Sequence, residues 1–409
     1  MTGRDGTKGN DRRRMSIVGG AVGAFAAVAA MATGSAVTAA PAKADIDALL
    51  DPIIQPIITS LSDALVGFDP AAAADLTSWT DSLLASLNSL DIGAALPASA
   101  EPAAAVAASS PSGVFDLPII VREGTEATVH ATIGGASNTL LVDSGSSGLV
   151  VPWQSLGSND FSALVNLFSH GFPVNVGESG YSGGVAYFYL TFNNIPVDYG
   201  SGLETSSAPT DVEIFSWPTA FGAPPNFEQF LADDDSTGIL GIGDAPNAGP
   251  GESPFEQAGF SGVTVDLPQN MLVVGANQGA NGLALTPIET LSGAPTPLSD
   301  LTEVVRTSTG TLIGSGKVSD DVDSGGVYGT LPSTIARNLA QGDTISVYDH
   351  STLLYSYQIG EGNAHAPEIF TGAPGANGID SGAEPFLHEP IFIGYGGAEG
   401  AITFDQPLI

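Results

Sequence analysis

One stretch that occurs twice decides the fold. Residues 133–152 read IGGASNTLLVDSGSSGLVVP, and residues 313–332 read IGSGKVSDDVDSGGVYGTLP. The copies share seven identical positions at one constant offset of 180 residues, more than composition alone would give. In each copy we expect a hairpin tip at the glycines (134–135 and 314–316), then a strand ending in Asp-Ser-Gly. An internal repeat of this kind indicates duplicated lobes.

The repeat places Asp143 and Asp323 at equivalent turns. If the turns meet across a pseudo-twofold axis, two carboxyl groups come within a few ångströms of each other. Like charges at that distance cannot both ionise, so the pair holds one proton between its members. One carboxylate can then activate a water as a base, while the other carboxyl donates to a scissile carbonyl. Two equivalent loops without chemistry are the plainer alternative.

The neighbours of the two Asp residues suit tight, locked turns. Gly145 and Gly325 allow the backbone to approach closely. The hydroxyls of Ser144 and Ser324 can hydrogen-bond the equivalent turn. We also assign Ser146 to the support of the first loop.

The sequence pattern from residue 114 onward is typical of a β protein. Short β-branched or aromatic runs, such as 128–133, 185–192 and 344–348, alternate with Gly, Asn, Asp and Pro. This pattern predicts a mainly β, bilobal fold. We divide it into an N-terminal lobe over 114–280 and a C-terminal lobe over 281–409.

Three segments precede the β region. Residues 1–44 resemble an export signal peptide, with a basic start, a soft apolar stretch and a small-residue cleavage site. Paired arginines allow either Sec or twin-arginine export. Apolar residues at three- and four-residue steps predict a helical segment over 45–90, and 91–113 is an Ala/Pro/Ser-rich linker. We expect an exported protein, secreted or attached to the cell surface, with 45–90 as a candidate contact to the cell envelope.

The composition excludes several functions. The chain has 44 acidic and 10 basic residues, a formal net charge of −34 and no cysteine. Such an acidic surface repels phosphate backbones, which argues against a nucleic-acid partner. Without cysteine, disulfides, thiolate nucleophiles and Cys-based metal sites are excluded. We expect a monomer that uses no cofactor and no metal.

Together, these features resemble the pepsin-like aspartic proteases. The first copy, 143–152, closely matches the first active-site loop of that family, and 236–243 resembles the apolar-apolar-Gly segment that supports the first Asp. The exported architecture and the Asp-Ser-Gly-Gly second loop are more narrowly similar to mycobacterial secreted proteases that cleave PE-domain proteins. The resemblance covers 114–409. It implies a bilobal β fold and an aspartic endopeptidase that hydrolyses polypeptide substrates from secreted or cell-surface proteins.

The sequence also departs from that family. Gly326 stands where most members have a Ser or Thr whose hydroxyl bonds the outer oxygen of the second Asp. The stretch 386–391 lacks the usual apolar-apolar-Gly, and no PE domain is apparent near the N-terminus. The family expects a β-hairpin flap with a tyrosine; the hairpin 174–192 is our candidate, with Tyr181 preferred over Tyr187 and Tyr189.

Competing interpretations remain open at this point. Ser182 fits a G-x-S-x-G elbow, which needs a helix after it, whereas 185–192 predicts a strand. Ser324 resembles the nucleophile of trypsin-like proteases, but that chemistry needs a His held by an Asp, and His130 falls within an expected strand. A catalytically silent bilobal surface binding protein is the alternative that Gly326 favours.

Overall fold

The structure is a computed structural model that describes residues 113–406 except 123, 172, 182–183, 207, 221, 233, 244–249, 293–297, 372–377 and 397–399. The signal peptide 1–44, the helical segment 45–90 and almost all of the linker 91–113 therefore lie outside the described residues. In the part of the chain that is described, no helix has both the length and the apolar character needed to cross a membrane.

Strands dominate the described residues, as the sequence predicts. The largest sheet has 15 strands, and two smaller sheets have five and two. Helical segments are short connections: the α-helices are α4 (Asp160–Ser169), α5 (Phe227–Ala232), α6 (Pro254–Gln257) and α7 (Glu384–His388). The 3-10 helices are η2 (Trp153–Leu156), η3 (Leu267–Gln269), η4 (Ala280–Gly282) and η5 (Glu361–Asn363).

The N-terminal lobe is one part of the large sheet, with the strand order β2-β3-β10-β4-β9-β6-β5. These strands are β2 (Glu126–Ile133), β3 (Ala136–Asp143), β4 (Ser147–Pro152), β5 (Asn175–Tyr181), β6 (Val185–Phe192), β9 (Thr210–Pro218) and β10 (Gly238–Ile242). The short strands β7 (Val197–Gly200) and β8 (Leu203–Thr205) pair beside β2. Every residue of β4 and β10 is buried. Near-continuous apolar runs of this kind are typical of strands covered on both faces.

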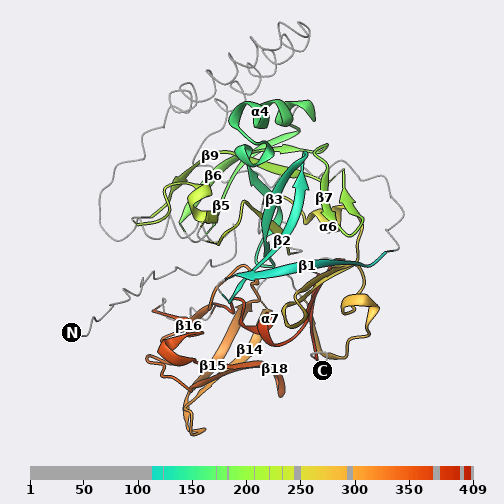
Figure 1. Cartoon of the computed structure of the whole chain (residues 1–409). Helices are drawn as coiled ribbons and strands as arrows, with labels where there is room; N and C mark the ends of the chain where they lie inside the picture. The colour runs from blue at the N-terminus through green and yellow to red at the C-terminus, as the bar shows by residue number, and fades with distance from the viewer. Residues whose placement is uncertain are drawn as a thin grey trace, which may run out of the picture. The chain divides into compact units, whose positions relative to one another are not determined.

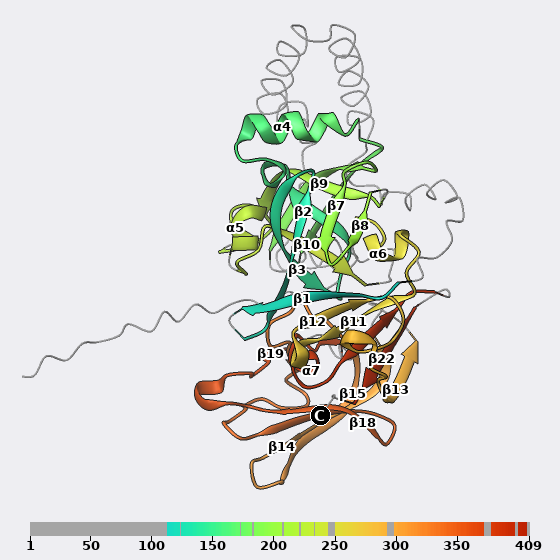
Figure 2. The same cartoon turned by 45° about the vertical axis from the view of Figure 1, so that its right-hand side comes forward.

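The long strand β1 (Phe115–Arg122) joins this lobe to a six-stranded segment of the same sheet. Its first half pairs with β12, from Phe115 to Pro118, and its second half pairs with β2, from Ile119 to Arg122. The six strands follow the order β13-β22-β21-β11-β12-β1. Their bounds are β11 (Gly262–Asp266), β12 (Met271–Val274), β13 (Pro287–Ser292), β21 (Ile391–Gly394) and β22 (Ala401–Asp405). Figures 1 and 2 both show β1 lying between the two lobes.

The C-terminal lobe has a five-stranded sheet with the order β18-β17-β14-β15-β20. Its strands are β14 (Leu298–Arg306), β15 (Leu312–Asp321), β17 (Thr344–Asp349), β18 (Thr352–Gln358) and β20 (Gly378–Asp380). The remaining pair is β16 (Thr330–Pro332) with β19 (Glu368–Phe370). These strands form the lower, orange to red part of Figure 1. The prediction of a mainly β, bilobal fold is thus confirmed.

The prediction of a hairpin tip at 314–316 is wrong. Gly134 and Gly135 do form the turn between β2 and β3, but Gly314 and Gly316 lie inside β15, opposite Val305 and Glu303. Gly314 is required there by close packing rather than by a turn, because an added Cβ would lie 1.9 Å from the carbonyl oxygen of Ile335. The turn itself falls at 307–311, where Gly310 has a φ of 84°.

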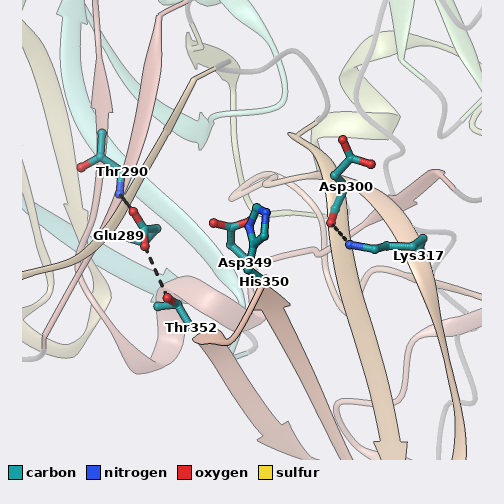
Figure 3. A network of polar contacts seen from close by, with 7 residues as sticks. All are labelled: Glu289, Thr290, Asp300, Lys317, Asp349, His350 and Thr352. Carbon is teal, nitrogen blue, oxygen red and sulfur yellow. Dashed lines mark hydrogen bonds and ion pairs between the residues drawn. The ribbon is translucent and has the colours of Figure 1, made fainter.

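A polar contact ties the six-stranded segment to the C-terminal lobe. Thr352 Oγ1, on β18, donates to Glu289 Oε2, on β13, over 3.4 Å (Figure 3). Within the lobe, the amine of Lys317 on β15 donates to the carbonyl oxygen of Asp300 on β14 (Figure 3). The first contact joins the edge strands of two sheets, and the second lies within the five-stranded sheet.

Candidate active site

The two Asp-Ser-Gly turns meet between the lobes. Asp143 is the last residue of β3, and Asp323 follows β15 by two residues. Both carboxyl groups are buried, with exposed fractions of 2% and 0%. The Gly145 N–H donates to Oδ1 of both carboxyl groups, so the two groups lie next to each other. The structure therefore brings together the two residues that the repeat singled out.

A reciprocal set of four hydrogen bonds holds the turns. Ser144 Oγ donates to the carbonyl oxygen of Val322 at 2.7 Å and accepts from the Ser324 N–H at 2.8 Å. Ser324 Oγ donates to the carbonyl oxygen of Val142 at 2.9 Å and accepts from the Ser144 N–H at 3.0 Å. Each hydroxyl thus satisfies one donor and one acceptor of the opposite lobe, which fixes the spacing of the two Asp residues.

The glycine of each turn packs against the carboxyl of the other. A Cβ at Gly145 would lie 2.6 Å from Asp323 Cγ, and a Cβ at Gly325 would lie 2.7 Å from Asp143 Cγ. The bare backbone also donates: the Gly145 N–H bonds Asp143 Oδ1 at 2.9 Å and Asp323 Oδ1 at 3.2 Å. The Gly325 N–H bonds Asp323 Oδ1 at 2.8 Å. Only glycine allows this approach without displacing a carboxyl.

The outer oxygens of the two carboxyl groups differ. Ser146 Oγ donates to Asp143 Oδ2 at 2.5 Å. The position related to Ser146 by the 180-residue repeat is Gly326, which has no hydroxyl. Asp323 Oδ2 is buried and has no hydrogen-bond partner among the described residues. The pseudo-symmetry of the turns is therefore broken at one oxygen.

This asymmetry affects where the proton lies. Burial raises the pKa of the Asp143 carboxyl, and hydrogen bonds from Asp323, Ser146 and Gly145 partly offset that rise. The pKa of the Asp323 carboxyl is raised well above its usual range. Burial is the largest cause, and the charges of Asp143, Asp380 and Asp321 add to it. Hydrogen bonds that stabilise a carboxylate favour its ionised form. The negative charge is accordingly favoured on Asp143 and the proton on Asp323.

A supporting strand pairs in parallel with each strand that leads into an Asp-Ser-Gly turn. β10 pairs in parallel with β3, with Gly241 beside Asp143, and antiparallel with β4. In the C-terminal lobe the parallel partner of β15 is β20, with Asp380 beside Asp321. The stretch 386–391, where the sequence comparison looked for the second support, instead belongs to α7 and the start of β21. The C-terminal support lies earlier in the chain than we expected.

Sequence reasoning missed Asp380 and its neighbour Ser381. Ser381 Oγ accepts from the Asp323 N–H at 3.3 Å, and Asp380 Oδ1 accepts from the Gly382 N–H at 2.7 Å. A signal was available, because 380–382 is a third Asp-Ser-Gly in the chain. It lies outside the 180-residue repeat, so only the strand pairing connects it with Asp323.

The hairpin expected over 174–192 is present as β5 and β6, paired from Asn175–Thr191 to Tyr181–Val185. Tyr181 is the last residue of β5, and its ring stacks on Phe230 and Phe227 with centroid separations of 5.6 and 5.9 Å. Burial raises the pKa of its hydroxyl, and the charge of Asp143 adds to the rise. Tyr181 therefore lies close enough to Asp143 to be affected by its charge, while its role on a flap stays a prediction.

The remaining tyrosines and the serine alternatives have other environments. Tyr187 is fully buried and Tyr189 nearly so, and the Tyr189 hydroxyl lies over Gly177. Ser324 Oγ is committed to the lock described above, and His130 is exposed within β2. Ser182 lies outside the described residues.

This pairing of lobes and turns defines an aspartyl peptidase-like domain. The chain belongs to the family described as the PE-PGRS C-terminal aspartyl peptidase-like domain, whose model matches residues 115–403. Among individual proteins, it is similar to PE cleavage protein A of Mycobacterium tuberculosis, with 32% identity over 315 residues, or 71% of this chain and 52% of the relative. PE cleavage protein A of Mycobacterium marinum is 31% identical over the same length. The chain spans about half the length of these curated relatives.

Proposed function

We propose that this chain is an aspartic endopeptidase in which Asp143 and Asp323 activate one water. The observation that carries the proposal is the buried pair of carboxyl groups, which share the Gly145 N–H as a donor and are held by reciprocal serine bonds from both lobes. Two acids that share a proton provide a base and an acid at one place. No covalent intermediate with the enzyme is needed.

The asymmetry of the pair assigns a role to each residue. Asp143, whose ionised form Ser146 stabilises, takes a proton from the water as the water oxygen attacks the peptide carbonyl carbon. Asp323 gives its proton to the carbonyl oxygen, and a tetrahedral gem-diol forms. Asp143 then passes its proton to the leaving nitrogen while a gem-diol hydroxyl returns a proton to Asp323. The C–N bond breaks, one water is consumed, and both carboxyl groups regain their starting states.

The substrates that we propose are PE-domain proteins at or outside the cell surface. The curated relatives are named PE cleavage protein A, and residues 1–44 resemble an export signal. Incubating a secreted PE-domain protein with the purified chain, followed by mass spectrometry of the fragments, tests this substrate class. We also propose a secreted or envelope-associated monomer, with 45–90 as the envelope contact.

The activity itself is tested with casein from about pH 4 to about pH 7, with and without pepstatin. Asp143→Asn and Asp323→Asn are each expected to lower kcat by at least about 1,000-fold, because each removes one half of the proton relay. Their circular dichroism should match that of the wild type. Asp300→Asn, which changes an exposed acid on β14, is the matched control and should keep full activity.

Two results would contradict the dyad. Substantial activity in either Asp variant would show that the pair is not the catalyst. Cleavage that resists pepstatin but stops with a serine-directed reagent would point to Ser324 or Ser182. Absence of cleavage in the folded wild type would favour the silent binding protein, for which the missing hydroxyl at Gly326 is the supporting observation.

A further inference from the structure

The break in symmetry at Asp323 has a counterpart on the neighbouring strand. Asp143 Oδ2 accepts from Ser146, whereas Gly326 leaves Asp323 Oδ2 without a partner among the described residues. On the supporting strands, Ile239 pairs with Leu141 and Asp380 pairs with Asp321. Since Leu141 and Asp321 are related by the 180-residue repeat, Asp380 occupies the place of Ile239. The lobe that lacks the hydroxyl thus carries an extra carboxyl.

The carboxyl of Asp380 lies beside Gly326, the position that has no side chain. An ideal Cβ at Gly326 would be 3.2 Å from Asp380 Oδ1 and 3.4 Å from Asp323 Oδ2. Both oxygens therefore border the point where a side chain would begin in the other lobe. The same Cβ would be 2.9 Å from Gly382 Cα, so the backbone leaves no room for a serine there.

Asp380 is built into this position. Its side chain is 1% exposed, Oδ1 accepts from the Gly382 N–H at 2.7 Å, and Oδ2 has no partner among the described residues. Asp380 Oδ1 and the unsatisfied Asp323 Oδ2 border the same small space, so a proton held by Asp380 would give Asp323 Oδ2 a donor.

We propose that Asp380 is a positioning residue for Asp323: in its protonated form it supplies the hydrogen-bond donor that Ser146 supplies in the other lobe. The inference deepens the proposed protease function and rests on it. When Asp323 gives its proton to the substrate carbonyl, it becomes a carboxylate in a buried site. The O–H of Asp380 then donates to Asp323 Oδ2 and stabilises the new charge without transferring its own proton.

The surroundings favour the protonated form of Asp380. The titratable groups that act on it are Asp320, Asp321, Asp323 and Asp143, all of which are acids. Burial and the charges of Asp320 and Asp143 raise the pKa of the Asp380 carboxyl well above its usual range, although the Gly382 N–H opposes the rise. Asp320 is itself bonded by the Tyr355 hydroxyl at 2.7 Å, so it has a donor of its own.

Two substitutions of Asp380 distinguish a role as hydrogen-bond donor from a role as negative charge. Asp380→Asn keeps a donor of the same shape but cannot ionise, and it should retain kcat within about threefold and leave the alkaline limb of the kcat profile in place. Asp380→Leu removes the donor and should lower kcat by about 10- to 100-fold with KM unchanged, which is the effect of losing a hydrogen bond to a charged group. Asp343→Ala is the matched control, because Asp343 is a buried acid of the same lobe that binds the Ala340 N–H at 2.8 Å. It should lower stability and keep kcat.

Three results would overturn the proposal. Wild-type kcat in both the Asn and the Leu variant would show that no donor is needed. Loss of kcat in both, with folding intact, would show that the carboxylate is needed instead. A move of the alkaline limb to lower pH in Asp380→Asn would show that Asp380 is charged in the active enzyme.

A spectroscopic measurement keeps this test separate from that of the protease function. In the full chain, the infrared band of protonated carboxyl groups near about pH 6 should weaken in Asp380→Asn relative to the wild type. An unchanged band overturns the inference even in an active enzyme. If the band weakens in Asp380→Asn but the wild type cleaves nothing, Asp380 is protonated as we propose, and only the protease function is refuted.

Discussion

Buried acids make the stability of this fold depend on pH, and Asp211 allows the effect to be isolated. Asp211 lies on β9 with 1% of its surface exposed. Thr191 Oγ1 donates to Asp211 Oδ1 at 2.5 Å, while Oδ2 has no partner among the described residues. Burial raises the pKa of this carboxyl from 3.8 to about 7, and the Thr191 hydroxyl opposes the rise.

The sign follows from proton binding. Because the folded state holds the proton more tightly than the unfolded chain, the stability that Asp211 contributes is complete below about pH 4 and is lost as the pH rises through about 7. A shift of about three pKa units corresponds to about 4 kcal/mol in the free energy of unfolding. The change Asp211→Asn keeps the shape of the side chain and removes the titration.

Urea unfolding at about pH 4 and about pH 8 measures the difference. The wild type should lose about 4 kcal/mol more than Asp211→Asn between these two conditions. Any constant cost of the amide cancels, because the comparison is between pH dependences. Glu204→Gln, on the exposed side of β8, is the control and should keep the wild-type dependence. Equal pH dependence in Asp211→Asn and the wild type would refute the reasoning.

Two further predictions concern the turns. Gly325→Ala places a Cβ 2.7 Å from Asp143 Cγ and should lower kcat by about 100-fold, because the carboxyl must move by close to an ångström; wild-type kcat in steady-state cleavage assays would contradict the packing argument. Ser146→Ala removes the 2.5 Å bond that stabilises the ionised Asp143, so the acid limb of kcat/KM should move to higher pH by about one unit. A limb that stays in place, measured over the full pH range, would mean that Asp143 is not the base.

The repeat was sufficient to predict the pairing of the lobes. Equal spacing of Asp143 and Asp323 from their flanking residues indicated equivalent turns, and the hydroxyl of each following serine was expected to lock the opposite turn. The structure has these bonds at 2.7 to 3.0 Å. Local sequence predicts this part well, because each turn is short and its chemistry lies within three consecutive residues.

Packing over long separations could not be predicted in the same way. Gly314 appeared to belong to a turn, but its lack of a side chain serves the approach of the Ile335 carbonyl. The C-terminal support was sought at 386–391, although the parallel partner of β15 is β20. In both cases the deciding contact joins segments that are more than 20 residues apart and share no sequence pattern.

From its sequence alone, the chain determined two β lobes, a pair of matched acidic turns and the glycine and serine chemistry that each turn requires. The sequence also showed that Asp323 lacks the hydroxyl that Ser146 gives to Asp143, but the tertiary structure alone decided which group lies beside Asp323 instead. Ser146 reaches Asp143 from three residues away, but the oxygen of Asp323 is bordered by Asp380, which strand pairing brings in from 57 residues further along the chain. The proton of a buried pair depends on every neighbouring charge and donor, and those neighbours are set by the packing of strands rather than by their order in the sequence.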